Sequence, residues 1–355
     1  MFALFQIPKM GIGSSSGYSY VATAQWLLDG STHYGSAGFA RASRAFQPLP
    51  EDLSACCFIV TGANSGLGKQ TALDLALKRA AVHLVCRSKE RGEEALADLR
   101  RQAPPGTPLE LHICDFSSMD SVKAFAAQWE ARKVPLHGLI LNAGFIAPRY
   151  ELVGGLESSW ATAMSQSYLL SGLLLPSLLR ASEGPAAAAS GAPLRSPPAR
   201  IIHVSSGGGL TVKCDVADIN SASKRAQAFD GTLQYAHSKR AQMLLAEAWA
   251  ARVPSARVGV YSMHPGWADT EGVRSSLPEF REKHKASLRS VQQGADTIVW
   301  LASAPALPEG ASGKLFFDRA EASQHFALAG TTSSSAEKEA LWRNCAAACA
   351  WEFKS

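Results

Sequence analysis

Two groups of residues in this sequence have the types and spacing needed for proton transfer. Tyr235 and Lys239 lie four positions apart in the segment YAHSK, so a helix would place both on one face. An ammonium group nearby lowers the pKa of a phenol from about 10, which makes Tyr235 a usable acid or base near neutral pH. Ser205 and Ser206 follow a strand-like run, where a hydroxyl can hold a substrate oxygen beside that phenol. Because Tyr-x-x-x-Lys is common by chance, its meaning depends on the motifs before it.

A glycine-rich turn, TGANSGLG (residues 61–68), lies between a strand-like and a helix-like segment. This order brings a dinucleotide pyrophosphate onto a helix N-terminus, where free N–H groups and the helix dipole favour negative charge. Its three glycines would make the tight turn, admit the phosphates and let the helix pack against the strand. A plain strand-to-helix turn remains the alternative for the motif alone. The residues predicted to bind the cofactor are Gly62, Asn64, Ser65, Gly66, Leu67 and Gly68.

The end of the second strand-like segment indicates which dinucleotide binds. It reads VCRS and contains no acid that could hydrogen-bond the ribose hydroxyls. Arg87 instead offers a planar cationic fork that suits a 2′-phosphate, and Ser88 adds a hydroxyl. We therefore predict NADP(H) as the cofactor and NAD(H) as the second choice. The alternative reading of Arg87 is a solvated arginine at a strand end.

Two further strand ends carry candidate cofactor contacts. Asp115 follows the third strand-like segment, where it would meet the adenine edge. Asn142, Ala143 and Gly144 follow the fourth and form a small-residue turn that a cofactor can approach closely. Either could be an ordinary turn by itself. Their positions at successive strand ends favour one shared binding site.

Alternating strand-like and helix-like segments must position these residues. The pattern is typical of an α/β protein with a Rossmann-type, doubly wound parallel sheet in a single domain, whose ligands bind beyond the carboxyl ends of the strands. The predicted strands are residues 56–60, 81–86, 109–114, 138–141, 200–204 and 258–263, and the principal helices are 91–101, 118–129 and about 235–252.

The segments outside this pattern divide the chain into a core and two extensions. We predict an N-terminal extension over 1–50, a Rossmann domain over 51–325 with a disordered low-complexity insertion at 181–199, and a C-terminal helical extension over 326–355. Residues 168–179 read as one buried helix, and residues 335–353 as the final helix. In the first extension, a short helical arm would pack on the core through Trp26, Leu27, Leu28, Tyr34 and Phe39.

The composition narrows the class of protein and its partners. The 355 residues are 46% apolar and 18% charged, which is typical of a globular protein. No apolar run approaches the roughly 20 residues that span a bilayer. A net charge of +5 without a basic block predicts no nucleic-acid partner. The seven cysteines favour reduced thiols in the cytoplasm, and no spacing completes a metal site. Organelle targeting by the N-terminal extension and a homo-oligomer stay open.

Taken in order, TGANSGLG, NAG, VSS, YxxxK and HPG resemble the short-chain dehydrogenase/reductases over about residues 55–320. Longer spans are similar to a branch near the retinol-dehydrogenase-like reductases. The resemblance implies a tyrosine acid/base at Tyr235, substrate binding by Ser206, and Lys239 as both activator and ribose ligand. It also implies that Pro265, Gly266 and Thr270 hold the nicotinamide, and that Trp267 and the stretch to about Arg289 shape the substrate pocket.

One position departs from the family pattern. The resemblance implies an asparagine in the helix after NAG, which holds a water behind the lysine. Ala163 stands there, and a one-residue shift would offer Ser165 or Gln166 instead.

We therefore carry two hypotheses. The first is an NADP(H)-dependent oxidoreductase moving hydride between nicotinamide and the carbonyl or secondary alcohol of a small apolar molecule. The second is a protein that binds NADP(H) with weak or no turnover.

Overall fold

A computed structural model describes residues 18–183, 198–220 and 228–354. Its centre is one eight-stranded sheet with the order β10-β9-β8-β7-β4-β1-β2-β3, in which all neighbours are parallel except β9 and β10. A two-stranded hairpin, β5 and β6, stands apart from it. The strands are β1 (Cys57–Thr61), β2 (Ala81–Cys86), β3 (Leu109–Ile113), β4 (Gly138–Leu141), β5 (Leu152–Val153), β6 (Leu156–Glu157), β7 (Ala199–Val204), β8 (Val258–Met263), β9 (Leu315–Phe317) and β10 (Ala320–Ala322).

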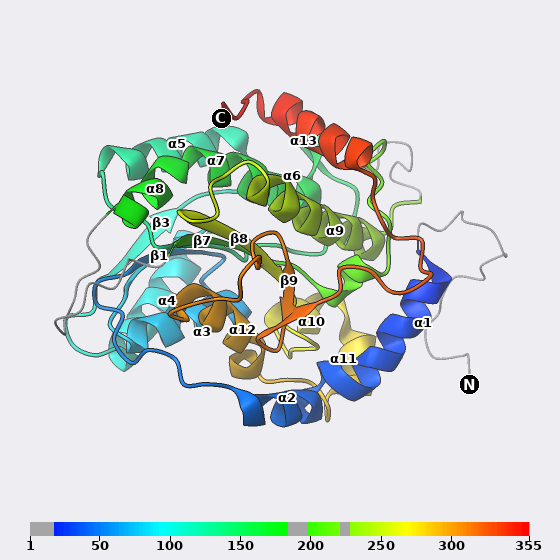
Figure 1. Cartoon of the computed structure of the whole chain (residues 1–355), viewed down its shortest axis with the longest axis horizontal. Coiled ribbons are helices and arrows are strands. Elements are labelled where there is room, and N and C mark those ends of the chain that lie inside the picture. The colour runs from blue at the N-terminus through cyan, green and yellow to red at the C-terminus, as the bar shows by residue number, and fades with distance from the viewer. Residues whose placement is uncertain (1–17, 184–197, 221–227, 355) are drawn as a thin grey trace.

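Helices cover both faces of the sheet (Figure 1). One face carries α3, α4 and α12, and the other carries α5, the α6–α8 segment and α9, with α13 outermost. The helices are α1 (Tyr20–Asp29), α2 (Ser36–Ala42), α3 (Gly66–Leu77), α4 (Lys89–Gln102), α5 (Met119–Ala131), α6 (Ser158–Met164), α7 (Ser171–Leu173), α8 (Leu175–Glu183), α9 (Gly231–Ala250), α10 (Glu271–Ser276), α11 (Pro278–His284), α12 (Val291–Ser303) and α13 (Ser335–Cys349). Four shorter helical turns are η1 (Gly30–Tyr34), η2 (Ser43–Ala45), η3 (Ser165–Leu170) and η4 (Gly207–Leu210).

The strand order confirms the predicted doubly wound fold. Residues 57–61 pair with 81–85 on one side and with 138–140 on the other, so the sheet grows in both directions from β1. The crevice between the carboxyl ends of β1 and β4 is the point where such folds bind ligands. The six predicted strands match the observed ones to within one residue at each end.

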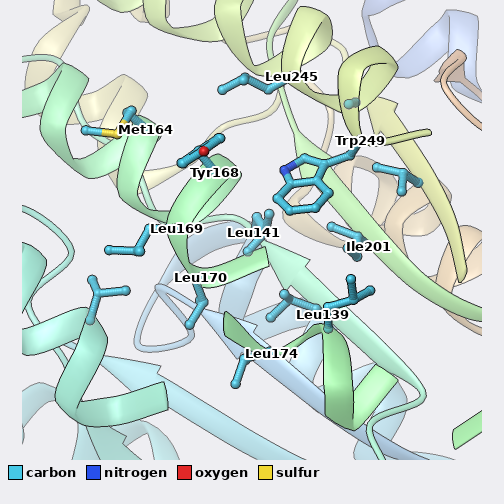
Figure 2. Packing of buried hydrophobic residues seen from close by; sticks show 14 of the residues in the cluster. Leu139, Leu141, Met164, Tyr168, Leu169, Leu170, Leu174, Ile201, Leu245 and Trp249 are labelled. Carbon is cyan, nitrogen blue, oxygen red and sulfur yellow. The ribbon is translucent and has the colours of Figure 1, made fainter. Parts of the chain in front are cut away.

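The larger apolar core lies between the sheet and the layer containing α9 (Figure 2). Leu139, Leu141 and Ile201 project from the sheet toward Tyr168 and Trp249 of the helical layer. A second apolar core fills the opposite face, beneath α3, α4 and α12. Within the described residues, no helix is both long and apolar enough to cross a bilayer.

Several expected helices begin, end or break elsewhere than predicted. Helix α9 begins one turn before Tyr235, because the Asp230 side chain accepts hydrogen bonds from the first free N–H groups. Helix α13 ends at Cys349, since Ala350 is left-handed with φ 44°. The expected single helix over 168–179 is wrong, because η3, α7 and α8 divide it. Helix α4 extends the predicted segment 91–101 by two residues at its start, where Ser88 caps it.

The N-terminal arm, here residues 18–46, packs on the core through α1, η1, α2 and η2. Trp26 and Tyr34 make the expected aromatic contacts, both with Trp267. Leu28 is 66% exposed, so its prediction as an anchor is wrong. The predicted insertion at 181–199 falls mostly outside the described residues. The ends of that insertion are ordered chain, since residues 181–183 finish α8 and Ala199 begins β7.

Candidate active site

The glycine turn and the NAG turn are locked together at the crevice between β1 and β4. The Asn142 side-chain amide donates to the carbonyl of Thr61 at 2.9 Å, and the Thr61 hydroxyl accepts from the backbone N–H groups of Asn142 and Ala143 at 2.8 and 3.0 Å. A Cβ on Gly68 would lie 2.4 Å from the Gly62 carbonyl oxygen. Gly68 is therefore required by helix-to-strand packing, as its spacing predicted.

Gln166 of η3 supports this junction from behind. The Thr61 hydroxyl donates to its side-chain oxygen at 2.6 Å, and its amide donates to the carbonyls of Thr162 and Ala143 at 2.7 and 3.0 Å. Ala163 is buried in the apolar core and offers no polar group. Gln166 thus stabilises the NAG turn itself, and the position behind Lys239 is filled by other side chains, described below.

The two serines after β7 have different environments. The Ser205 hydroxyl is buried and donates to the backbone carbonyl of Lys239 at 2.8 Å, which fixes β7 to α9. Ser206 is half-buried, accepts from the N–H of Gly208 at 3.2 Å, and hydrogen-bonds the Tyr235 phenol. Only Ser206 therefore faces the tyrosine, in agreement with the serine that the resemblance implied.

Lys239 lies buried beside the ring of Tyr235. Its Nζ is 5.4 Å from the ring centroid, as expected for residues one helical turn apart. The same Nζ donates to the Val204 carbonyl at 2.8 Å and to the side-chain oxygen of Gln242 at 2.9 Å. A Cβ on Gly144 would lie 3.4 Å from this Nζ, so the NAG turn closes over the lysine. Ser206, Tyr235, Lys239 and the NAG turn thus form one cluster.

Burial controls the titration of this cluster. Desolvation raises the pKa of Tyr235 to about 12, and the hydrogen bond from Ser206 opposes that rise. Desolvation lowers the pKa of Lys239 to about 7. The prediction that the pKa of Tyr235 is lowered is therefore wrong. The reason is that a buried site disfavours both charged forms, so the lysine is only about half protonated at pH 7.

Behind Lys239, a buried chain of side chains stands where the family pattern has asparagine and water. Gln242 accepts from the Lys239 Nζ and donates through its amide to the Ser167 hydroxyl at 3.2 Å. Gln242 is 1% exposed. The sequence analysis missed it, although a residue three positions after Lys239 must share its helix face. Ser167 was missed because the π-helical turn of η3 changes which residues face inward.

The predicted cofactor-specificity residues lie at the carboxyl ends of β2 and β3. The Arg87 side chain is exposed and forms no hydrogen bond or ion pair with any residue that the structure describes. The Ser88 hydroxyl accepts from the Arg91 N–H at 3.2 Å and donates to Glu90 at 2.9 Å. Asp115 accepts the backbone and side-chain hydrogen bonds of Ser117. Arg87 is therefore free to bind an anion, whereas Ser88 and Asp115 also shape their own loops.

The loop after β8 meets the glycine turn from the other side. A Cβ on Gly66 would lie 3.6 Å from the Thr270 side chain. Thr270 caps α10, and Gly266 is left-handed with φ 74°. A Cβ on Gly266 would lie 2.6 Å from the Tyr34 carbonyl oxygen, so this loop needs glycine where the N-terminal arm crosses it.

The N-terminal arm brings aromatic side chains to the edge of the site. Trp26 packs on Trp267 with ring centroids 5.3 Å apart, and its Nε1 would lie 2.7 Å from a Cβ placed on Gly207, beside Ser206. The indole N–H groups of Trp26 and Trp267 are both buried and unpartnered among the described residues. The buried guanidinium of Arg289 fixes the arm, because it donates to the carbonyls of Tyr34 and His33 and pairs with Asp318.

Comparisons with known proteins agree with this geometry. The sequence model described as short chain dehydrogenase matches residues 57–229. Dehydrogenase/reductase SDR family member 12 of Bos taurus is 40% identical over 322 residues, which cover 90% of this chain and 95% of that protein. The chain belongs to the short-chain dehydrogenase/reductase family. The resemblance stated from the motifs is confirmed, and so is its narrower form, because member 12 represents the branch to which the longer spans are similar.

More distant relatives and solved structures belong to the same oxidoreductase family or fold. Retinol dehydrogenase 12 of Mus musculus is 32% identical over 263 residues, 73% of this chain and 77% of that protein. A crystal structure of an uncharacterised protein from Mycobacterium paratuberculosis superposes with a TM-score of 0.64 at 24% identity, covering 86% of this chain and 97% of that one. L-sorbose reductase from Gluconobacter frateurii, complexed with NADPH and L-sorbose, gives 0.55 at 17% identity, covering 76% and 97%.

Proposed function

We propose that this protein is an NADP(H)-dependent oxidoreductase that interconverts a carbonyl and a secondary or primary alcohol on a small apolar molecule. The observation that carries the proposal is the cluster of Ser206, Tyr235 and Lys239 beside the NAG and glycine turns. Nothing in a purely structural role requires a phenol, a hydroxyl and a buried amine to meet at the carboxyl end of β7.

The cofactor side of the proposal fits the residues present. Gly62 and Gly66 both have left-handed φ angles, 64° and 53°, which shape a turn open to phosphates at the start of α3. Arg87 is exposed, without a partner among the described residues, at the end of a strand that lacks an acid. These features support NADP(H) over NAD(H), and the NADPH complex of the sorbose reductase is consistent with that choice. When bound, NADPH supplies the hydride.

The chain's own residues supply the proton and the positioning. Ser206 donates to the carbonyl oxygen of the substrate and holds it against the Tyr235 hydroxyl. Tyr235 gives its proton to that oxygen as the carbon is reduced, and it takes the proton back in the opposite direction. Lys239, held by Val204 and Gln242, stabilises the phenolate that remains. We assign Gln242 and Ser167 the positioning role for which the family uses asparagine and water.

An apolar substrate is supported by the aromatic edge of the site. Trp26, Tyr34 and Trp267 gather beside the loop after β8, and Phe280 packs on Trp267 with ring centroids 5.2 Å apart. Retinol dehydrogenase 12 is named for an apolar alcohol, which makes related alcohols and aldehydes sensible first tests for this chain.

A second candidate function is NADP(H) binding with weak turnover. Two observations favour it. Ala163 cannot supply the polar group of the family pattern, and the phenol pKa of about 12 opposes proton exchange near neutral pH. A protein of this kind would bind NADP(H) at the same site but would catalyse little or no hydride transfer.

One experiment separates the two functions. Purified protein is first titrated with NADPH, and binding is followed by cofactor fluorescence. It is then incubated with NADPH and a panel of aldehydes and ketones that includes retinaldehyde, beside Tyr235→Phe. We expect consumption of NADPH that falls by about 10²- to 10⁴-fold in the variant, the usual contribution of a positioned acid/base. Binding by both proteins without Tyr235-dependent consumption establishes the weak-turnover function.

The cofactor choice has its own test. Arg87→Leu is expected to weaken NADPH binding about 10- to 100-fold, because charge-assisted contacts to phosphate are worth roughly 1.5–3 kcal/mol. NADH binding should change little. Arg101→Leu, on the exposed last turn of α4, is the matched control. Equal losses for both cofactors would refute the assignment of Arg87 to the 2′-phosphate.

A further inference from the structure

Three potential metal ligands share one face of the sheet at its far edge. His83 of β2 lies directly opposite Glu110 of β3 in the parallel register, and His112 lies two residues after Glu110. Side chains alternate along a strand, so positions 110 and 112 point to the same face, and paired residues of neighbouring strands share that face. This edge is separated from β7 and the candidate active site by β1 and β4.

The candidate ligand atoms of these three residues lie within 4.8 Å of one another. His83 Nδ1 lies 2.9 Å from His112 Nε2, and the two oxygens of Glu110 lie 3.5 and 3.6 Å from these nitrogens. Zinc binds imidazole nitrogen and carboxylate oxygen at roughly 2.0–2.2 Å, which puts neighbouring ligand atoms about 3.3 Å apart. Each nitrogen has a carboxylate oxygen near this distance, Oε2 for His83 and Oε1 for His112. A rotation of the carboxylate and a separation of the two nitrogens by a few tenths of an ångström would complete the set.

Aromatic side chains hold the two histidine rings in place. The Trp129 ring packs nearly at a right angle on His83 with centroids 4.7 Å apart, and Phe125 packs on His112 at 5.5 Å. The two imidazoles are therefore fixed on the same face of the sheet as Glu110.

Glu110 is oriented toward the histidines by an arginine. Arg132 donates to both of its carboxylate oxygens at 2.8 Å, and its guanidinium lies over the Trp129 ring. Each oxygen retains a lone pair, and ligating carboxylates are commonly held by such hydrogen bonds. The Glu110 side chain is 46% exposed, so water can reach the fourth position.

We propose that His83, Glu110 and His112 form a zinc site with one open coordination position, which ties the edge strand β3 to β2. The ligands come from two strands separated by a helix, so no short sequence spacing revealed them, and the sequence analysis predicted no metal. The site is independent of the proposed hydride transfer.

The test uses the full chain after treatment with a chelator. Zinc is titrated by calorimetry, and cobalt is added as a spectroscopic probe. We expect one equivalent to bind, a higher unfolding temperature with zinc, and the visible bands of four-coordinate cobalt without a thiolate charge-transfer band. The last point matters because the seven cysteines are free thiols that could also bind metal.

Matched variants make the result specific. Glu110→Gln and His112→Gln should each weaken zinc binding more than ten-fold, since even indirect changes around metal sites cost about 10- to 100-fold. Glu93→Gln, an exposed acid on α4, is the control and should bind zinc as the parent does. Circular dichroism verifies that each variant is folded. Absent binding, a thiolate band, or equal affinity in folded Glu110→Gln and His112→Gln overturns the proposal.

Discussion

The two halves of helix α9 bury side chains of opposite character on the same helix face. The first half presents Lys239 and Gln242, whose polar atoms are satisfied by Val204 and Ser167. The second half presents Leu245 and Trp249 to the apolar core (Figure 2). Both halves meet at Ser167, because Trp249 Nε1 donates to its carbonyl at 2.8 Å while Gln242 donates to its hydroxyl. The apolar second half fixes the helix against the core, and this fixed position holds the buried polar groups of the first half in place.

The difference shows how a buried amine is tolerated. Desolvation of Lys239 costs free energy, as its lowered pKa records. The apolar half offsets this cost, since Trp249 contacts Tyr168, Trp342 and Phe353 with ring centroids 4.9–6.2 Å apart. Changes in the apolar half should therefore reduce stability, whereas changes in the polar half should alter chemistry and its dependence on pH.

The largest effect on stability is expected from Trp249→Ala. It removes a fully buried indole and its hydrogen bond to Ser167, so the free energy of unfolding should fall by about 3–5 kcal/mol. Denaturant unfolding followed by circular dichroism measures this change. Trp351→Ala, a partly buried ring at the same cluster, is the graded control and should cost less. A loss below about 1 kcal/mol for Trp249→Ala would contradict an anchoring role.

The next effect is the pH dependence of stability caused by Lys239. Its pKa is about 7 in the folded chain and about 10.5 when unfolded, so between these values the unfolded state binds more protons. Stability should therefore rise with pH from 7 to 10, by up to roughly 1.4 kcal/mol per unit from this group. Below pH 7 the lysine is protonated in both states and its contribution to the slope vanishes.

Comparison with Lys239→Met isolates that slope. The free energies of unfolding of the parent and the variant are measured at several pH values between 6 and 10. The two should converge or cross as the pH rises, because only the parent gains stability when Lys239 loses its proton. Parallel curves for the two proteins would show that the lysine keeps an ordinary pKa in the folded chain.

A smaller effect is expected from Gln242→Leu. Loss of the amide frees Lys239 Nζ from one partner, so kcat of any Tyr235-dependent reaction should fall about ten-fold and its pH profile should shift. KM should change little, because Gln242 is buried behind the lysine. Gln242→Asn is the conservative variant and should recover part of the rate. An unchanged pH profile would assign Gln242 to packing alone.

The smallest effect is expected from Trp26→Ala in the N-terminal arm. Its ring lies at the edge of the site and is partly exposed, so stability should change by about 1 kcal/mol or less. KM for bulky apolar substrates should rise several-fold while NADPH binding stays the same. Steady-state kinetics and cofactor fluorescence measure the two quantities. Equal effects on small and bulky substrates would argue against a place for Trp26 in the substrate pocket.

The fold was predictable because its signals are local. Alternating strand and helix segments, the glycine turn and the strand-end motifs each lie within about ten residues, and a parallel sheet then brings the strand ends together. The positions of Ser206, Tyr235 and Lys239 follow from the same rule. Their roles in catalysis remain predictions that the kinetic tests address.

The missed features depend on long-range packing. The direction of the Tyr235 pKa shift depends on how deeply α9 is buried, which no spacing reveals. The partnership of Gln242 with Ser167 depends on a π-helical turn, and the contact of Trp26 beside Gly207 joins segments far apart in the chain. Sequence spacing located the candidate catalytic residues, and tertiary contacts determine their electrostatic environment.

The buried contacts of Arg289 also impose an order on biosynthesis. Its guanidinium holds the backbone at Tyr34 across a separation of 255 residues, and it pairs with Asp318 still further along. At roughly 5–20 residues per second, a ribosome needs about 10–50 s to reach Arg289 after it has synthesised Tyr34. The first helices made therefore cannot complete these contacts until residues 289 and 318 have been synthesised.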